Sequence, residues 1–166
     1  MSVVVELKAL MLRRPRLTLA VAESLTCGHL QAQIGAVPGA SEYFLGGITA
    51  YTLEQKVRHL GVKRAHARRV DCVSQQVAVE MAQGACGLFG ADLAVATTGY
   101  AQVNPAKEVS VPLAWWALCH RRRGGRAEVI SEMVTVPDAG RVEVQERVAA
   151  VVLRELVAYL REVRNV

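Results

Sequence analysis

Three short apolar runs, each followed by hydroxyl-bearing or glycine residues, constrain the fold of this chain most strongly. The runs span residues 17–22, 46–51 and 92–97. Such runs are typical of strands in a parallel sheet, which are covered on both faces. Apolar residues spaced by three and four positions predict helices between and around the runs. These helices cover residues 3–13, a short stretch ending near 34, and residues 53–60, 74–89 and 140–163.

The second half of the chain adds a predicted hairpin. Residues 109–118 and 127–136 have strand patterns, and the segment 121–125 between them predicts the turn. Alternating strands and helices followed by a hairpin predict a mixed sheet between two layers of helices. The 166 residues suffice for one domain with a substantial core, and no linker divides them. We therefore predict a single-domain, three-layer α/β/α sandwich over residues 1–166.

Composition excludes several classes of protein. Apolar residues make up 52% of the chain and the formal net charge is only +5, which argues against intrinsic disorder. No strictly apolar run reaches the roughly 18–20 residues of a membrane span, and the N-terminus lacks a signal-peptide pattern. The four cysteines form no C-x-x-C pair and the four histidines have no ligand spacing. We expect a cytoplasmic protein without membrane contact, metal site or cofactor.

Basic residues cluster in the segments 13–16, 63–69 and 121–126. Clusters of this kind neutralise phosphates and would permit nucleic-acid binding. Only 5% of the residues are aromatic, so few side chains are available to stack on bases. The pattern favours a solvated surface over a nucleic-acid interface.

The segment after the first apolar run carries two hydroxyl groups. Ser24 and Thr26 lie where a strand is predicted to end and a helix to begin, and Gly28 follows them. Ligands bind at the carboxyl ends of strands in open α/β sheets. The free N–H groups of a helix start can also stabilise an anion or an oxyanion. The alternative is that Ser24 or Thr26 only caps the helix.

The other two strand ends carry similar residues. Lys56 lies one turn into a helix, where the helix dipole would lower its pKa. A neutral lysine can take a proton from a serine hydroxyl, whereas an ordinary exposed lysine is the alternative. Thr98 and Gly99 follow the third run and could present N–H groups to a phosphate or carbonyl, or form only a tight turn.

These residues occur in an order that resembles the C-terminal domain of the competence/damage-inducible protein A (CinA) family. The matches lie mostly within residues 17–100. They are Ala22-Glu23-Ser24, Thr26, Gly28, Gly39-Ala40-Ser41, Phe44, Gly46-Gly47, Tyr51, Lys56, Val73-Ser74, Met81-Ala82-Gln83-Gly84-Ala85 and Thr98-Gly99. The known activity of this family domain is the deamidation of nicotinamide mononucleotide.

The resemblance implies an amide hydrolase that needs no metal or cofactor and converts the nicotinamide nucleotide to the nicotinic acid nucleotide plus ammonia. Ser24 would be the nucleophile, Lys56 the general base, and Tyr51 a residue that orders this pair. The N–H groups around residues 26–28 would stabilise the oxyanion. The substrate-binding residues implied in the same way are Thr26, Gly28, Gly47, Thr98, Gly99 and Arg141.

The chain also departs from the family pattern. Leu25 and Cys27 replace a cysteine and a glycine, and residues 100–108 replace a glycine-rich loop. The alternative function is therefore a catalytically impaired relative that binds a nucleotide or a protein. The resemblance further implies a domain without the N-terminal nucleotide-processing domain of many members. It also implies a homo-oligomer, with the apolar final helix as one candidate surface.

Overall fold

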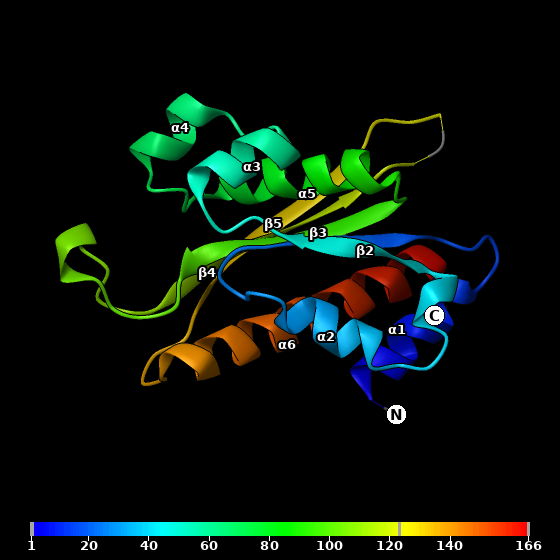
Figure 1. Cartoon of the computed structure of the whole chain (residues 1–166). Helices are drawn as coiled ribbons and strands as arrows, with labels where there is room; N and C mark the ends of the chain where they lie inside the picture. Colours follow the sequence, from blue (N-terminus) through cyan, green and yellow to red (C-terminus); the bar gives the residue numbers. More distant parts are fainter. Residues whose placement is uncertain (1, 123, 166) are drawn as a thin grey trace.

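A five-stranded mixed sheet divides the molecule into two helical layers (Figure 1). The structure is a computed structural model that describes residues 2–122 and 124–165. The strand order is β2-β1-β3-β4-β5; β1 pairs in parallel with β2 and β3, and β4 is antiparallel to β3 and β5. The strands are β1 (Leu19–Glu23), β2 (Phe44–Thr49), β3 (Leu93–Tyr100), β4 (Leu113–His120) and β5 (Glu128–Thr135). The predicted single-domain sandwich is confirmed.

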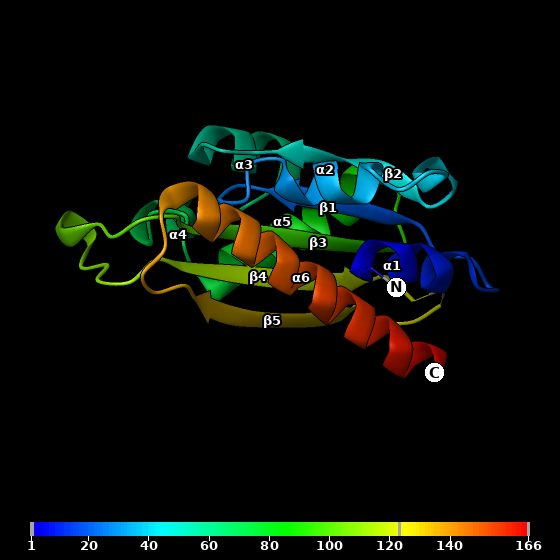
Figure 2. The ribbon, with the colours of Figure 1, turned by 90° about the horizontal axis from the view of Figure 1, so that it is seen from below.

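Helices lie on both faces of the sheet (Figures 1 and 2). One layer consists of α1 (Val3–Leu12), α2 (His29–Gly35) and α6 (Arg141–Arg164). The other consists of α3 (Leu53–Leu60), α4 (Arg64–Arg69) and α5 (Gln75–Phe89). Two short 3-10 helices span Ala40–Glu42 and Pro105–Lys107. The sequence predicted each α-helix except α4, where we saw only a basic cluster.

The two faces of the sheet differ in the size of their side chains. Successive residues of a strand point to opposite faces. In β1, Leu19 and Val21 join the core under α1, α2 and α6, whereas Ala20 and Ala22 join the core under α5. β3 repeats this alternation of large and small residues over residues 93–96. Alanines on the second face leave room for α5 to pack close to the sheet.

Close packing continues from α5 to α3. A Cβ atom at Gly84 of α5 would lie 2.1 Å from the carbonyl oxygen of Leu60, the last residue of α3. That distance is far below van der Waals contact, and the neighbour is backbone. Glycine is therefore required at position 84 by the approach of another chain segment.

Gly84→Ala should lower the free energy of unfolding by about 1–3 kcal/mol, because the added methyl group forces α3 and α5 apart. Gly87→Ala in the same helix is the matched control, since a Cβ there meets no atom within 4 Å. Alanine is a better helix former than glycine, so this control should raise stability by up to about 1 kcal/mol. Urea unfolding measures both changes. Equal effects of the two substitutions would contradict the packing argument.

Two expectations from the sequence need correction. β4 starts at Leu113 and not at Val109, because Val109 pairs with Asn104 across a short loop and Pro112 has no N–H for a strand ladder. The apolar face of α6 is not a free oligomer surface, since it lies in the core of the chain itself. The predicted turn between β4 and β5 lies partly outside the described residues. No helix in the described ranges is long and apolar enough to cross a bilayer.

Candidate active site

A polar cavity of about 260 Å³ lies where the carboxyl ends of β1 and β3 meet the start of α6. This edge of the sheet is the one from which the long loop after β3 extends in Figure 1. Parallel strands bring their carboxyl ends to one edge, so segments distant in sequence converge here. The predicted residues that line the cavity are Ser24, Tyr51, Lys56, Thr98, Gly99 and Arg141.

Ser24 and Lys56 form a buried pair in this cavity. Ser24 follows β1 directly, and Lys56 lies in the first turns of α3. The Lys56 Nζ atom is 2.8 Å from the Ser24 Oγ atom, and the two residues are 1% and 7% exposed, respectively. The sequence alone left open an exposed lysine and a simple cap. The geometry excludes the exposed lysine and places its amine against the serine hydroxyl.

The Lys56 amine has two further partners, both backbone carbonyls. Nζ donates to the oxygen of Ala50 at 2.8 Å and to that of Tyr51 at 2.9 Å. A neutral amine has two N–H groups and one lone pair. With both N–H groups on carbonyls, the lone pair faces the Ser24 hydroxyl. Neutral Lys56 therefore has the hydrogen-bonding pattern of a general base for Ser24.

Burial supplies the physical reason for a neutral amine, because removing an ammonium group from water disfavours the charged form. Burial lowers the pKa of Lys56 from 10.5 to about 8, and a thiolate at the neighbouring Cys72 would act in the opposite direction. Near neutral pH, a fraction of the molecules therefore holds Lys56 unprotonated.

The turn that carries Ser24 is fixed by backbone hydrogen bonds. The Ser24 N–H donates to the Thr97 carbonyl of β3, and the Cys27 N–H donates to the Ser24 carbonyl. Cys27 and Gly28 both have positive φ angles, of 47° and 99°. A Cβ at Gly28 would meet no atom within 4 Å, so glycine serves the backbone conformation there and not a close approach.

A buried carboxylate occupies the start of α2. Glu23 is fully buried, and its oxygens accept hydrogen bonds from the N–H groups of Gly28, Leu30 and Gln31 at 2.9–3.1 Å. The Gly28 N–H is therefore not the free oxyanion donor that we expected. Among the described residues, the N–H groups of Leu25 and Thr26 have no acceptor. The available donors thus lie directly after Ser24.

Two other predicted binding residues lie outside the cavity lining. The Thr26 hydroxyl is buried and bonds to the Thr97 hydroxyl at 2.8 Å, which ties the turn to β3. Gly47 lies in β2, where a Cβ would meet the side chains of Val21 and Gln31. The side chain of Thr26 and the backbone at Gly47 shape the frame of the site, and a contact of either residue with a substrate stays a prediction.

Tyr51 orders the pair through its backbone and not through its ring. Its carbonyl holds Lys56, whereas its side chain is 48% exposed and its hydroxyl accepts from the Arg141 guanidinium at 2.6 Å. Arg141 also donates to the Gln102 side chain at 3.3 Å. Both partners are uncharged, so the positive charge of Arg141 is not neutralised by them. Arg141 therefore offers an anion site at the mouth of the cavity.

Thr98 and Gly99 lie in the cavity wall for different reasons. The Thr98 hydroxyl donates to the carbonyl of Cys72 at 2.7 Å, which fixes the loop between α4 and α5. Gly99 is required by the neighbouring strand, since a Cβ there would lie 2.2 Å from the Leu113 carbonyl oxygen. The pair continues β3, so the expected turn at this point is wrong.

The family pattern has a glycine-rich loop after β3, and in this chain residues 100–108 form that loop with larger side chains. The Tyr100 hydroxyl donates to Asp71 at 2.9 Å, and Lys107 forms an ion pair with the same carboxylate at 3.5 Å. Burial, followed by this hydrogen bond, raises the pKa of Tyr100 to about 12. Sequence reasoning missed the cavity residues Asp71, Cys72, Tyr100, Gln102 and Asn104. No motif marked them, since their positions depend on contacts between distant segments.

Comparison with known proteins now decides the family. The model of the CinA C-terminal domain matches residues 2–160. The chain belongs to this family. A CinA-like protein of Chlorobium limicola is 38% identical over 156 residues, which cover 92% of this chain and 36% of the relative. A putative competence-damage inducible protein of Desulforamulus reducens is 40% identical over 102 residues, 61% of this chain and 25% of the relative. The matched residues thus span only 25% and 36% of the length of these curated relatives.

Solved CinA structures have the same fold. A CinA superfamily protein from Enterobacter cloacae superposes with a TM-score of 0.84 at 26% identity, covering 95% of this chain and 90% of the other. A competence/damage-inducible protein from Agrobacterium tumefaciens gives a TM-score of 0.82 at 27% identity, with coverages of 95% and 98%. The resemblance found in the sequence is confirmed at the level of family and fold.

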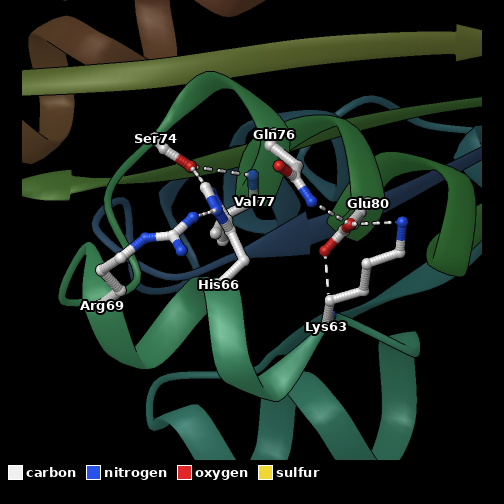
Figure 3. Close-up of polar contacts among 7 residues, drawn as sticks. All are labelled: Lys63, His66, Arg69, Ser74, Gln76, Val77 and Glu80. Carbon is white, nitrogen blue, oxygen red and sulfur yellow. Dashed lines mark hydrogen bonds and ion pairs between the residues drawn. The ribbon is translucent and has the colours of Figure 1, made fainter.

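A second serine of this CinA domain lies beside a histidine but serves the structure (Figure 3). The Arg69 guanidinium, which can only donate, lies 3.1 Å from His66 Nδ1, so the ring proton is on Nε2. Nε2 donates to the Ser74 hydroxyl oxygen at 2.9 Å, and the Val77 N–H donates to it as well. His66 therefore has no lone pair facing Ser74. The serine caps α5, as its sequence position predicts.

Metal-binding side chains do not gather at the site. In the parts of the chain that the structure describes, no group of three or more His, Cys, Asp or Glu residues is placed to hold a metal ion. The chemistry available in the cavity is that of the serine hydroxyl and the lysine amine, with the free N–H groups of Leu25 and Thr26 directly after Ser24.

The lowered pKa of Lys56 predicts a pH-dependent stability. Between pH 8 and 10.5 the unfolded chain binds a proton at this lysine that the folded chain does not, so the free energy of unfolding rises with pH. The full rise corresponds to about 3 kcal/mol. Urea unfolding across this window should show the rise in the parent and not in Lys56→Met.

Lys63→Met is the control for this measurement, because the Lys63 side chain is 75% exposed. This variant should retain the whole rise. A parent and a Lys56→Met variant with the same dependence on pH would contradict a pKa lowered by burial.

Proposed function

We propose that the protein hydrolyses the carboxamide of nicotinamide mononucleotide to the nicotinic acid nucleotide and ammonia. The observation that carries this proposal is the buried Lys56 amine, which lies 2.8 Å from the Ser24 hydroxyl with its two N–H groups on carbonyls. Membership in the CinA family supports the same class of reaction.

The first half of the reaction acylates Ser24. Its oxygen attacks the carboxamide carbon while neutral Lys56 takes the hydroxyl proton. The oxygen of the carboxamide becomes an oxyanion, which the free N–H groups of Leu25 and Thr26 stabilise. Lys56 then returns the proton to the departing nitrogen. Ammonia leaves, and the nicotinoyl group remains as an ester on Ser24.

The second half repeats these steps with water. Lys56 removes a proton from the water molecule as the water oxygen attacks the ester carbon. The same N–H groups stabilise the second oxyanion, and Lys56 returns the proton to the Ser24 oxygen as the ester bond breaks. The product carries a carboxylate where the substrate had an amide.

Arg141 provides the binding group for the phosphate of the nucleotide. It lies in the wall of the same cavity, and its hydrogen-bond partners, Tyr51 and Gln102, are neutral. A planar guanidinium can pair with two phosphate oxygens at once. The substrate would therefore extend from the dyad to the start of α6.

Ser24→Ala and Lys56→Met should each lower kcat for ammonia release from nicotinamide mononucleotide by at least about a thousandfold, since each removes one member of the dyad. An enzyme-coupled ammonia assay measures the loss, and circular dichroism checks the fold. In the parent, kcat/KM should rise with pH as Lys56 loses its proton near pH 8. Ammonia release that survives Ser24→Ala would refute the proposed nucleophile.

Arg141→Gln should raise KM about tenfold or more with a smaller change in kcat, because it removes a charged contact to phosphate. Tyr51→Phe is the informative companion. It keeps the carbonyl that holds Lys56 and removes only the hydroxyl on Arg141. Its kcat should stay within a few-fold of the parent. A collapse of kcat in Tyr51→Phe would contradict ordering through the backbone.

Nucleotide binding without turnover is the second candidate function. The observation in its favour is the replacement of the glycine-rich loop by residues 100–108, anchored through Asp71. Such a loop offers side chains in place of a backbone cradle for phosphate. Calorimetry with nicotinamide mononucleotide separates the two functions, since binding by the folded parent without ammonia release would favour the second.

A further inference from the structure

A second cavity lies at the opposite edge of the sheet from Ser24. Its volume is about 510 Å³, and it is formed by the segment before β1, the end of β4 and the end of α6. Figures 1 and 2 place the C-terminal end of α6 far from its start. Arg141 is the first residue of this helix, so it lies at the other end. The charged and titratable residues of its lining are Arg16, Asp92, His120, Arg121, Arg122 and Arg164.

Positive charge exceeds negative charge in this lining, with four arginines and one aspartate. Asp92 accepts hydrogen bonds from the N–H and the hydroxyl of Thr18. Arg122 pairs with Glu128. Within the described ranges, Arg16 and Arg121 make no ion pair. The cluster therefore lacks neutralising partners for several of its charges.

Arg164 extends this excess of positive charge into the protein interior, where part of its guanidinium group has no hydrogen-bond partner. One of its terminal nitrogens, Nη1, donates to the Pro15 carbonyl at 2.9 Å. Its Nε and Nη2 atoms are buried without an acceptor among the residues that the structure describes. Buried donors of a charged group are costly to leave unpaired. Burial and the charge of Arg13 lower the pKa of Arg164, which reflects the same unfavourable environment.

A histidine in the same lining is held in one tautomer. Tyr159 donates its hydroxyl proton to the Glu128 carboxylate at 3.0 Å, because a carboxylate can only accept. The Tyr159 oxygen must then accept the 2.8 Å hydrogen bond from His120, so the ring proton is on Nδ1. Nε2 keeps its lone pair and has no partner among the described residues. Burial, and secondly Arg122, lower the pKa of His120, which keeps the ring neutral at pH 7.

We propose that this cavity is a second ligand site, which binds a phosphate group that presents an O–H to His120. The arginines pair with the anionic oxygens, and the O–H donates to Nε2 of His120. Inorganic hydrogen phosphate carries such an O–H itself, and a sugar phosphate carries it on a neighbouring hydroxyl. Sulfate has the same shape as phosphate but no proton at neutral pH. The site is independent of the proposed amide hydrolysis.

Calorimetry of the whole chain at pH 7.5 tests the proposal, with inorganic phosphate, sulfate and ribose 5-phosphate as probes. Phosphate should bind about tenfold more tightly than sulfate, the effect of one hydrogen bond to a charged ligand. Arg164→Gln and Arg121→Gln should each weaken phosphate binding about tenfold. Arg58→Gln on the exposed face of α3 is the matched control and should leave it unchanged.

His120→Phe should abolish the preference for phosphate over sulfate, because it removes the acceptor while the arginines remain. Should that variant fail to fold, nitrogen-15 NMR of the parent shows whether the His120 ring proton is on Nδ1. In Tyr159→Phe, which removes the oxygen that accepts from Nδ1, the ring proton should no longer be confined to Nδ1. A proton found on Nε2 in the parent would overturn the proposal.

Three further outcomes decide the site. Equal affinities for phosphate and sulfate would refute the role of His120. Phosphate binding lost in Arg141→Gln but kept in Arg164→Gln would assign the ligand to the first cavity and refute the second site. Tighter binding of ribose 5-phosphate than of inorganic phosphate would support an organic phosphate as the ligand, and the reverse order would support the free ion.

Discussion

The site depends on keeping one lysine amine away from water. Lys56 loses the hydration of its charged form on burial, and the carbonyls of Ala50 and Tyr51 satisfy the two N–H groups of its neutral form. Those carbonyls lie in the connection between β2 and α3, so the path of the chain there is tied to the amine. Ser24 is the remaining partner, with its hydroxyl oxygen 2.8 Å from the amine, and the proposed function makes this amine its base. The burial of the Lys56 amine thus depends on the path of the chain between β2 and α3 and sets the protonation of the amine.

Local patterns in the sequence sufficed to predict the layers, whereas the pairing of Ser24 with Lys56 was implied only by the family resemblance. Short, almost wholly apolar runs marked β1 and β3, and helical spacing marked the helices that cover them. The topology is consistent with Ser24 and Lys56 lying close together, because parallel strands end at a common edge of the sheet. Family resemblance assigned their roles. The sequence therefore predicted periodicity and the order of elements along the chain correctly, and the catalytic roles of Ser24 and Lys56 stay predictions.

Hydrogen-bond partners across the fold could not be predicted. The Glu23 carboxylate accepts a hydrogen bond from the Gly28 N–H, and the hydroxyls of Thr26 and Thr97 bond to each other, so these two groups already have partners within the fold. The helix α4 escaped notice because its six residues are mostly basic and lack an apolar period. The anchoring of Tyr100 to Asp71 joins segments 29 residues apart and leaves no local pattern.

The ties between the turn at Ser24 and Thr97 set an order of events during synthesis. Thr26 and Thr97 are 71 residues apart, and the Ser24 N–H also bonds to the Thr97 carbonyl. A nascent chain that has emerged from the ribosome only through α5 holds both Ser24 and Lys56 but lacks the strand against which this turn is fixed. The dyad therefore reaches its final geometry only after β3 has emerged and paired with β1.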